Sequence, residues 1–108
     1  MMTRAEHLLA CLAEECDEVG QRAMKGLRFT LCDVQPGQGL NNAERLNYEI
    51  VDLLTVIEML WEEGILPEVG LGLRAVMGAA KKVKIEKYME YAHLVGALET
   101  KKGPPGQA

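Results

Sequence analysis

Apolar residues recur at helical spacing over two long stretches of the chain, and each stretch begins with a capping signal. Thr3 and Glu6 have the spacing of a helix-capping box, and the apolar pattern that follows predicts a helix to about Leu27. Asn41 is followed by an acid three residues later and predicts a second helix over about residues 43–63. These two helices are the most clearly patterned elements of the chain.

The segments around these helices carry turn residues. The helical spacing stops between Arg28 and Leu40, where Pro36-Gly-Gln-Gly39 predicts a loop. Gly64 suits the position just after the second helix. A less regular apolar pattern, preceded by a Gly-rich stretch, predicts a third helix over about residues 73–98.

Composition supports an all-α fold. Apolar residues make up 48% of the 108 positions, but aromatic residues only 5%, so Leu, Ala, Val, Met and Ile carry the apolar surface. This mixture favours helices over a β-sandwich. We expect one domain over residues 1–100, in which the first two helices pack antiparallel and the third completes the bundle. The Gly- and Pro-rich tail, residues 101–108, is expected to be disordered.

The second helix is apolar on more than one side. Tyr48, Val51 and Met59 lie outside its main apolar stripe. So small a chain has little else with which to cover them. The pattern therefore predicts that a second copy of the chain completes the bundle, as a homodimer or a homotetramer.

Charge and cysteine content exclude several classes of protein. A net charge of −4 disfavours a nucleic-acid partner, which calls for a basic surface. No stretch is apolar enough for a membrane span, and Arg4 and Glu6 interrupt any signal-peptide pattern, so we expect a cytoplasmic protein without a membrane partner. Three cysteines and two histidines show no zinc-binding spacing.

The candidate chemistry lies in two acidic pairs, each on the apolar side of a predicted helix. At 100° per residue, Glu15 shares a face with Leu8 and Leu12, and Glu18 follows one turn later. Glu49 likewise shares a face with Leu53, and Asp52 lies three residues after it. Carboxylates that share a helix face repel each other and are costly to desolvate. A divalent cation with oxygen ligands would remove this cost.

A single acidic pair on a helix is most simply a solvated surface feature, and Asp17 and Glu58 on the outer faces fit that interpretation. The two pairs border the apolar stripes of two consecutive helices, however. If the helices pack as a hairpin, all four carboxylates converge on one point. The repetition favours a functional site.

Glu14-Glu-x-x-Glu18 followed by Glu49-x-x-Asp52 resembles the MazG-like nucleotide pyrophosphohydrolases of the all-α NTP pyrophosphatase superfamily, in particular small stand-alone and phage-encoded members. The resemblance covers about residues 5–65 and weakens beyond them. One departure is the spacing, because the 30 residues between Glu18 and Glu49 are slightly more than is usual for the family. The Pro-Gly loop can absorb the excess.

The resemblance implies Mg²⁺-dependent hydrolysis of a nucleoside triphosphate to the monophosphate and pyrophosphate, with Mn²⁺ able to substitute. Matching positions assign Glu15, Glu18, Glu49 and Asp52 to the metal. Glu14 would be an accessory ligand or would orient the attacking water. Mg²⁺ prefers carboxylates together with waters and phosphate oxygens, which agrees with these roles.

Phosphate binding calls for basic residues near these acids. Arg22 and Lys25 lie further along the first helix, and Lys81 and Lys84 belong to a lysine-rich run in the third. Ordinary surface charge is an alternative for each. The alternative for the whole chain is a non-catalytic helical oligomer whose acids bind a structural cation or a basic partner. No feature of the sequence identifies a nucleotide base.

Overall fold

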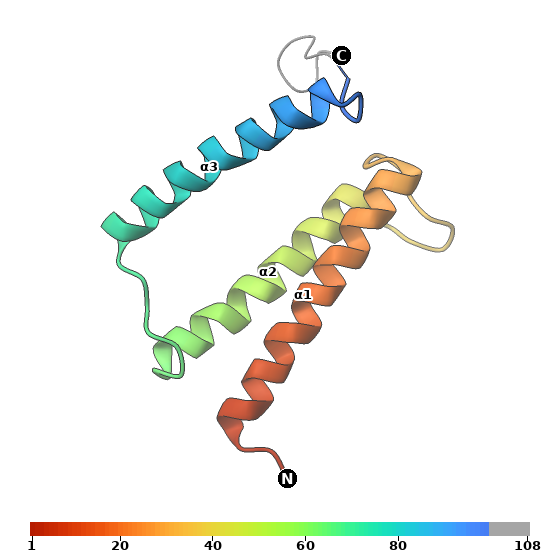
Figure 1. The fold of residues 1–108 in the computed structure, drawn as a ribbon. Coiled ribbons are helices and arrows are strands. Elements are labelled where there is room, and N and C mark those ends of the chain that lie inside the picture. Colours follow the sequence, from red (N-terminus) through yellow and green to blue (C-terminus); the bar gives the residue numbers. More distant parts are fainter. Residues whose placement is uncertain (100–108) are drawn as a thin grey trace. The chain divides into compact units, whose positions relative to one another are not determined.

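The computed structural model describes residues 1–99. They form three helices, α1 (Arg4–Phe29), α2 (Asn42–Glu62) and α3 (Leu71–Leu94), and no strand occurs within this range. The all-α prediction is therefore confirmed. Contacts divide the chain into a first unit, Met1–Glu68, and a second that begins at Val69. Figure 1 shows the helices of both units, and each unit is described by itself.

Both predicted capping boxes are present. At the start of α1, the Glu6 backbone N–H donates to the Thr3 hydroxyl at 3.1 Å, and the Thr3 backbone N–H donates to the Glu6 carboxylate at 3.0 Å. Asn41 and Glu44 make the same reciprocal pair at the start of α2, at 2.8 and 3.1 Å. These bonds satisfy backbone donors that the first turn of a helix leaves without partners.

Glycines at positive φ end α2 and α3. Gly64 has φ +68° and follows the C-cap residue of α2, Glu63, as its position in the sequence predicts. The third helix was predicted to reach residue 98, and this is wrong: α3 ends at Leu94. Gly96 has φ +80°, which lets the next backbone N–H, that of Ala97, donate to the Ala92 carbonyl at 2.8 Å and closes the helix.

The first unit is an antiparallel hairpin of α1 and α2 (Figure 1). Arg4 at the beginning of α1 makes a two-pronged ion pair with Glu63 just after α2, with N–O distances of 2.7 and 2.8 Å. Close to this pair in sequence, Leu8 and Leu60 are the buried apolar side chains of the described residues, 6% and 0% exposed. The predicted packing of the first two helices is thus confirmed.

A tight corner joins the two helices. Thr30, just after α1, has φ +70° and ψ +154°, a conformation that residues with a side chain rarely adopt. The Asn42 side chain is 1% exposed and donates a 2.9 Å hydrogen bond from Nδ2 to the Thr30 carbonyl oxygen. The Asn42 and Ala43 backbone N–H groups also donate back into the loop, to Asp33 and Leu31. These bonds fix the direction in which α2 leaves the corner.

The second unit is described as far as residue 99 and consists mainly of α3. None of the residues of α3 is buried. The prediction that this helix completes the bundle stays a prediction, and the predicted disordered tail, 101–108, lies outside the described residues. Among residues 1–99, no helix is both long enough and apolar enough to cross a membrane.

Candidate functional site

Three of the four predicted metal ligands meet between the helices of the hairpin. Glu15 and Glu18 come from α1 and Glu49 from α2, and each offers a carboxylate oxygen within 4.8 Å of the other two. All three side chains are half-buried. Two helices thus bring three carboxyl groups to one point, as the spacing of the two pairs predicts.

Helix geometry explains why these acids point inward. Glu15 follows the buried Leu8 by seven residues, and Glu49 precedes the buried Leu60 by eleven. Steps of seven and eleven residues return to almost the same side of a helix. The contact that buries the two leucines therefore also turns the two glutamates toward the opposite helix.

One oxygen of each of these glutamates is shielded. Glu15 Oε2 and Glu49 Oε2 are buried and have no hydrogen-bond partner among the described residues. A shielded polar atom without a partner is costly, and a shielded negative charge is more costly still. Both atoms are acceptors that require a hydrogen-bond donor or a cation.

The cluster raises the pKa of two of its members. Desolvation is the largest cause for Glu15, followed by the negative charges of Asp52, Glu49 and Glu14. For Glu18, the largest cause of the raised pKa is a hydrogen bond with Glu49, which only a protonated carboxyl can donate, and the nearby acids add to it. A positive charge placed at the cluster would therefore be favoured.

Asp52 and Glu14 lie at the edge of the cluster. Both are exposed, and neither belongs to the group whose oxygens approach within 4.8 Å. Their charges nevertheless raise the pKa of Glu15, so both carboxylates lie within electrostatic reach of it. They can bind a shared cation from the solvent side or through a water molecule.

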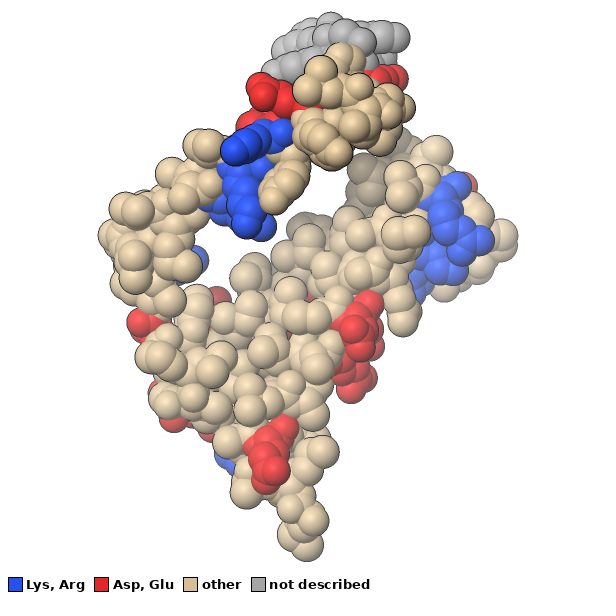
Figure 2. All heavy atoms as spheres, in the orientation of Figure 1, with Lys and Arg blue, Asp and Glu red and all other residues tan. Residues whose placement is uncertain are grey.

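Two predicted phosphate-binding residues follow the acids along α1. Arg22 is half-buried one turn after Glu18, and within residues 1–99 it makes no ion pair. Lys25 is also half-buried and holds its Nζ atom 5.8 Å from the centre of the Phe29 ring. Figure 2 shows basic side chains gathered beside the last turns of α1 and acidic ones beside its middle turns. A substrate with negative charge can thus meet cations along the same helix as the carboxylates.

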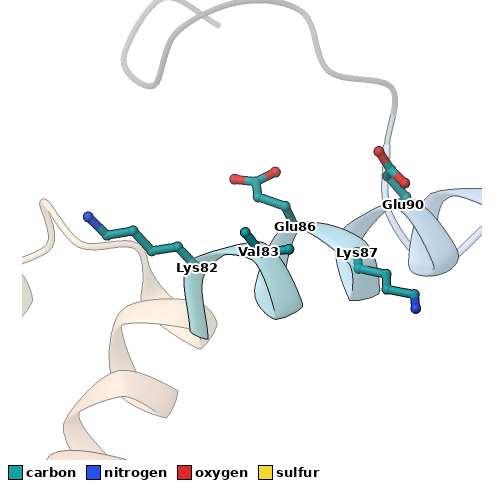
Figure 3. Close-up of a pocket in the computed structure, with 5 residues that line it drawn as sticks. All are labelled: Lys82, Val83, Glu86, Lys87 and Glu90. Atoms are coloured by element: carbon teal, nitrogen blue, oxygen red, sulfur yellow. The ribbon is translucent and has the colours of Figure 1, made fainter. Parts of the chain in front are cut away.

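The other two predicted phosphate-binding residues, Lys81 and Lys84, are exposed on α3 in the second unit. A shallow hollow on this helix is lined instead by Lys82, Val83, Glu86, Lys87 and Glu90 (Figure 3). In this view Lys87 points away from Glu86 and Glu90. Mixed charges line the hollow, so it does not resemble a phosphate site, and the role of Lys81 and Lys84 stays a prediction.

One buried polar residue on the same side of α2 as Glu49 was not singled out from the sequence. Asn42 precedes Glu49 by seven residues on the same side of α2, and its Oδ1 atom is buried without a partner among residues 1–99. The seven-residue spacing could have placed Asn42 on the same side of α2 as Glu49. Asn is common near the start of a helix, however, so the residue type alone does not indicate a special role. Its Nδ2 bond to Thr30 gives Asn42 a structural role in the corner that positions α2.

No protein-family model, curated protein or solved structure gives a significant match to this chain.

Proposed function

We propose that the chain is a Mg²⁺-dependent nucleoside triphosphate pyrophosphohydrolase that converts a nucleoside or deoxynucleoside triphosphate to the monophosphate and pyrophosphate. One observation carries the proposal: Glu15, Glu18 and Glu49 converge from two helices, and two of their oxygens are shielded without partners. The sequence resemblance to the MazG-like enzymes supports the same activity and membership of that superfamily.

The residues fit a hard divalent cation. Carboxylate oxygens are the protein ligands that Mg²⁺ prefers, and Mn²⁺ accepts the same set. The cluster is open on one side, since Asp52 and Glu14 are exposed. An open side suits Mg²⁺, which keeps waters and phosphate oxygens among its ligands. When bound, the cation would supply charge neutralisation for the triphosphate and polarise the reacting phosphoryl group.

The side chains of the chain would act around that cation. Glu15, Glu18 and Glu49 would hold it, with Asp52 completing the set from the solvent side. Glu14 would be an accessory ligand or would orient the water molecule that attacks the α-phosphoryl group. Arg22 and Lys25 would pair with phosphate oxygens and stabilise the departing pyrophosphate, because charge neutralisation supplies most of the rate enhancement in phosphoryl transfer.

The proposal includes assembly into a homodimer or homotetramer. The hairpin buries few apolar side chains, and the outer side of α2 leaves Tyr48, Val51 and Leu54 57%, 52% and 51% exposed. An apolar helix face of this kind is typical of a contact between protein chains. A second copy of α2 would cover it.

Incubation with a panel of ribo- and deoxyribonucleoside triphosphates, with and without Mg²⁺, tests the activity through release of pyrophosphate. The proposal requires pyrophosphate and nucleoside monophosphate in equal amounts, and only with the cation. Release of inorganic phosphate, or no turnover with any nucleotide, would contradict it. The panel also identifies the preferred base and sugar.

The alternative is a helical oligomer without catalytic activity, whose cluster binds a structural cation or a basic partner. The orphaned oxygens of Glu15 and Glu49 fit such a cation equally well. This alternative predicts stabilisation by divalent cations without nucleotide turnover. The unpaired Arg22 beside the acids favours the enzyme, since a purely structural site has no need of a cation-binding group and an anion-binding group side by side.

A further inference from the structure

One side of α1 has no partner within the hairpin. Asp17, Gln21, Met24 and Arg28 follow one another along it in steps of four, three and four residues, and all four are exposed. Such steps keep side chains on one face of a helix. The buried positions of α1, Leu8 and Gly26, lie on the opposite side. We define the α1 outer face as the residues Asp17, Gly20, Gln21, Met24 and Arg28.

The α1 outer face carries a shallow hollow beside an open glycine. Gly20, Gln21, Met24, Lys25 and Arg28 line a shallow hollow there. A Cβ atom at Gly20 would meet no other atom within 4 Å among the described residues, so the backbone of α1 is open to close approach. Met24, 54% exposed, supplies an apolar side chain beside that opening. Gaps over small residues with an adjacent large one allow side chains of two helices to interlock.

The charges of two α1 outer faces are complementary when the two helices pack antiparallel. The four-three-four spacing reads the same in both directions along the helix. In an antiparallel pair of α1 helices, Asp17 of each copy therefore lies opposite Arg28 of the other, and Gln21 lies opposite Met24. The acid and the base lie about 8 Å on either side of the midpoint, at a rise of about 1.5 Å per residue. A parallel pair would place like charges together.

Arg28 is suited to this contact. Its guanidinium carbon lies 4.8 Å from the centre of the Phe29 ring. An Arg that stacks on an aromatic ring keeps the N–H groups at its edge free for a carboxylate. Charge complementarity of this kind fixes the orientation of partners and disfavours other arrangements.

We propose that the α1 outer face binds the same face of a second copy of the chain, antiparallel, with two Asp17–Arg28 ion pairs flanking Gln21 and Met24. This contact is separate from the one proposed for α2, and it uses none of the carboxylates that would hold the metal. With both contacts formed, two dimers join into a tetramer with two-fold symmetry.

Sedimentation equilibrium of the wild type, Asp17→Arg, Arg28→Asp and the double variant tests the contact. The single changes place like charges opposite each other twice per contact and should weaken this association about tenfold or more. At protein concentrations where the wild type is assembled, each single variant should have half its mass. The double variant restores both ion pairs, with the base now at position 17 and the acid at position 28. It should recover the mass of the wild type.

The two single variants change the net charge in opposite directions, so an effect of net charge alone cannot dissociate both. Glu68→Arg, an exposed position between α2 and α3, serves as a control with the same charge change as Asp17→Arg. Circular dichroism checks that the helices are intact. Single variants with the mass of the wild type, a folded double variant that stays dissociated, or a wild type that is monomeric throughout would each overturn the proposal.

Discussion

Glu15 on α1 and Glu49 on α2 each present to the other helix a carboxylate oxygen that is shielded from solvent and lacks a partner among residues 1–99. Together with Glu18 they form a group whose oxygens approach within 4.8 Å. The pKa of Glu15 is raised, first by desolvation and then by the surrounding negative charge. Without a cation, ionisation of Glu15 therefore opposes the packing of the two helices. The stability of the hairpin should consequently depend on divalent cations and on pH.

Millimolar Mg²⁺ or Mn²⁺ should raise the melting temperature. A ligand that binds only the folded state stabilises it by about 1.4 kcal/mol at ten times its Kd, which corresponds to a rise of roughly 5–10 °C for a domain of this size. Calorimetry with a series of cation concentrations measures the effect, and NaCl at equal ionic strength is the control. A melting temperature that ignores Mg²⁺, both with and without nucleotide, would speak against the site.

Without divalent cations, stability should fall as the pH rises from about 4.5 toward neutrality. The pKa values of Glu15 and Glu18 are raised in the folded state, so over this range the folded protein binds more protons than the unfolded one, and each rise in pH favours unfolding. The ion pair with Arg4 has the opposite effect, since it lowers the pKa of Glu63 and its contribution is lost only at lower pH.

Urea unfolding between pH 4.5 and 7.5 measures this dependence. Glu15→Gln removes one of the titrating groups and should flatten the decline, and saturating Mg²⁺ should flatten it in the wild type. Glu68→Gln, which removes an exposed acid between α2 and α3, is the matched control and should leave the slope unchanged. An identical slope in Glu15→Gln and the wild type would show that the cluster does not titrate in this way.

The hairpin and the meeting of the acids could be predicted from the sequence because both depend on local spacing. Thr3 with Glu6, and Asn41 with Glu44, start the helices as the capping pattern predicts. The steps from Leu8 to Glu15 and from Glu49 to Leu60 then fix which way each acid points. Helical periodicity also places Asp52 next to Glu49, but it does not give the rotation of α2 that leaves Asp52 exposed.

Other features depend on contacts between distant residues. The corner between the helices needs a hydrogen bond from Asn42 to Thr30, which holds Thr30 at positive φ. Neither an Asn nor a Thr at these positions predicts this arrangement. The end of α3 depended on recognising Gly96 as a closing residue, whereas the apolar pattern continues to Leu98. Periodicity alone also does not specify which part of the protein packs against α3, because that depends on tertiary contacts.

Thr30→Gly should stabilise the hairpin by about 1 kcal/mol. A residue with a side chain in this sparsely populated conformation costs about 1–3 kcal/mol, and the greater freedom of Gly in the unfolded chain offsets part of the gain. Chemical denaturation monitored by circular dichroism measures the difference. Thr30→Ala keeps the Cβ atom and should give no such gain, so equal stabilisation by both variants would contradict the assignment to backbone strain.

Glu18→Gln should reduce pyrophosphate release by orders of magnitude at saturating Mg²⁺, because it removes one charge from the group that holds the cation without changing side-chain shape. Asp52→Asn should also impair turnover, and more of its loss should be recovered by raising the Mg²⁺ concentration, since Asp52 lies outside the close group and would bind from the solvent side. Steady-state kinetics at several Mg²⁺ concentrations separates these two effects.

Folding provides the control for this experiment. Without metal, Glu18→Gln should be as stable as the wild type or slightly more stable, because a negative charge leaves a crowded acidic group that already raises the pKa of Glu18 itself. A loss of turnover accompanied by a gain in metal-free stability is expected of a functional site and not of a structural one. Glu68→Gln should leave both quantities unchanged. Turnover at the level of the wild type in both amide variants would place the active site on other residues.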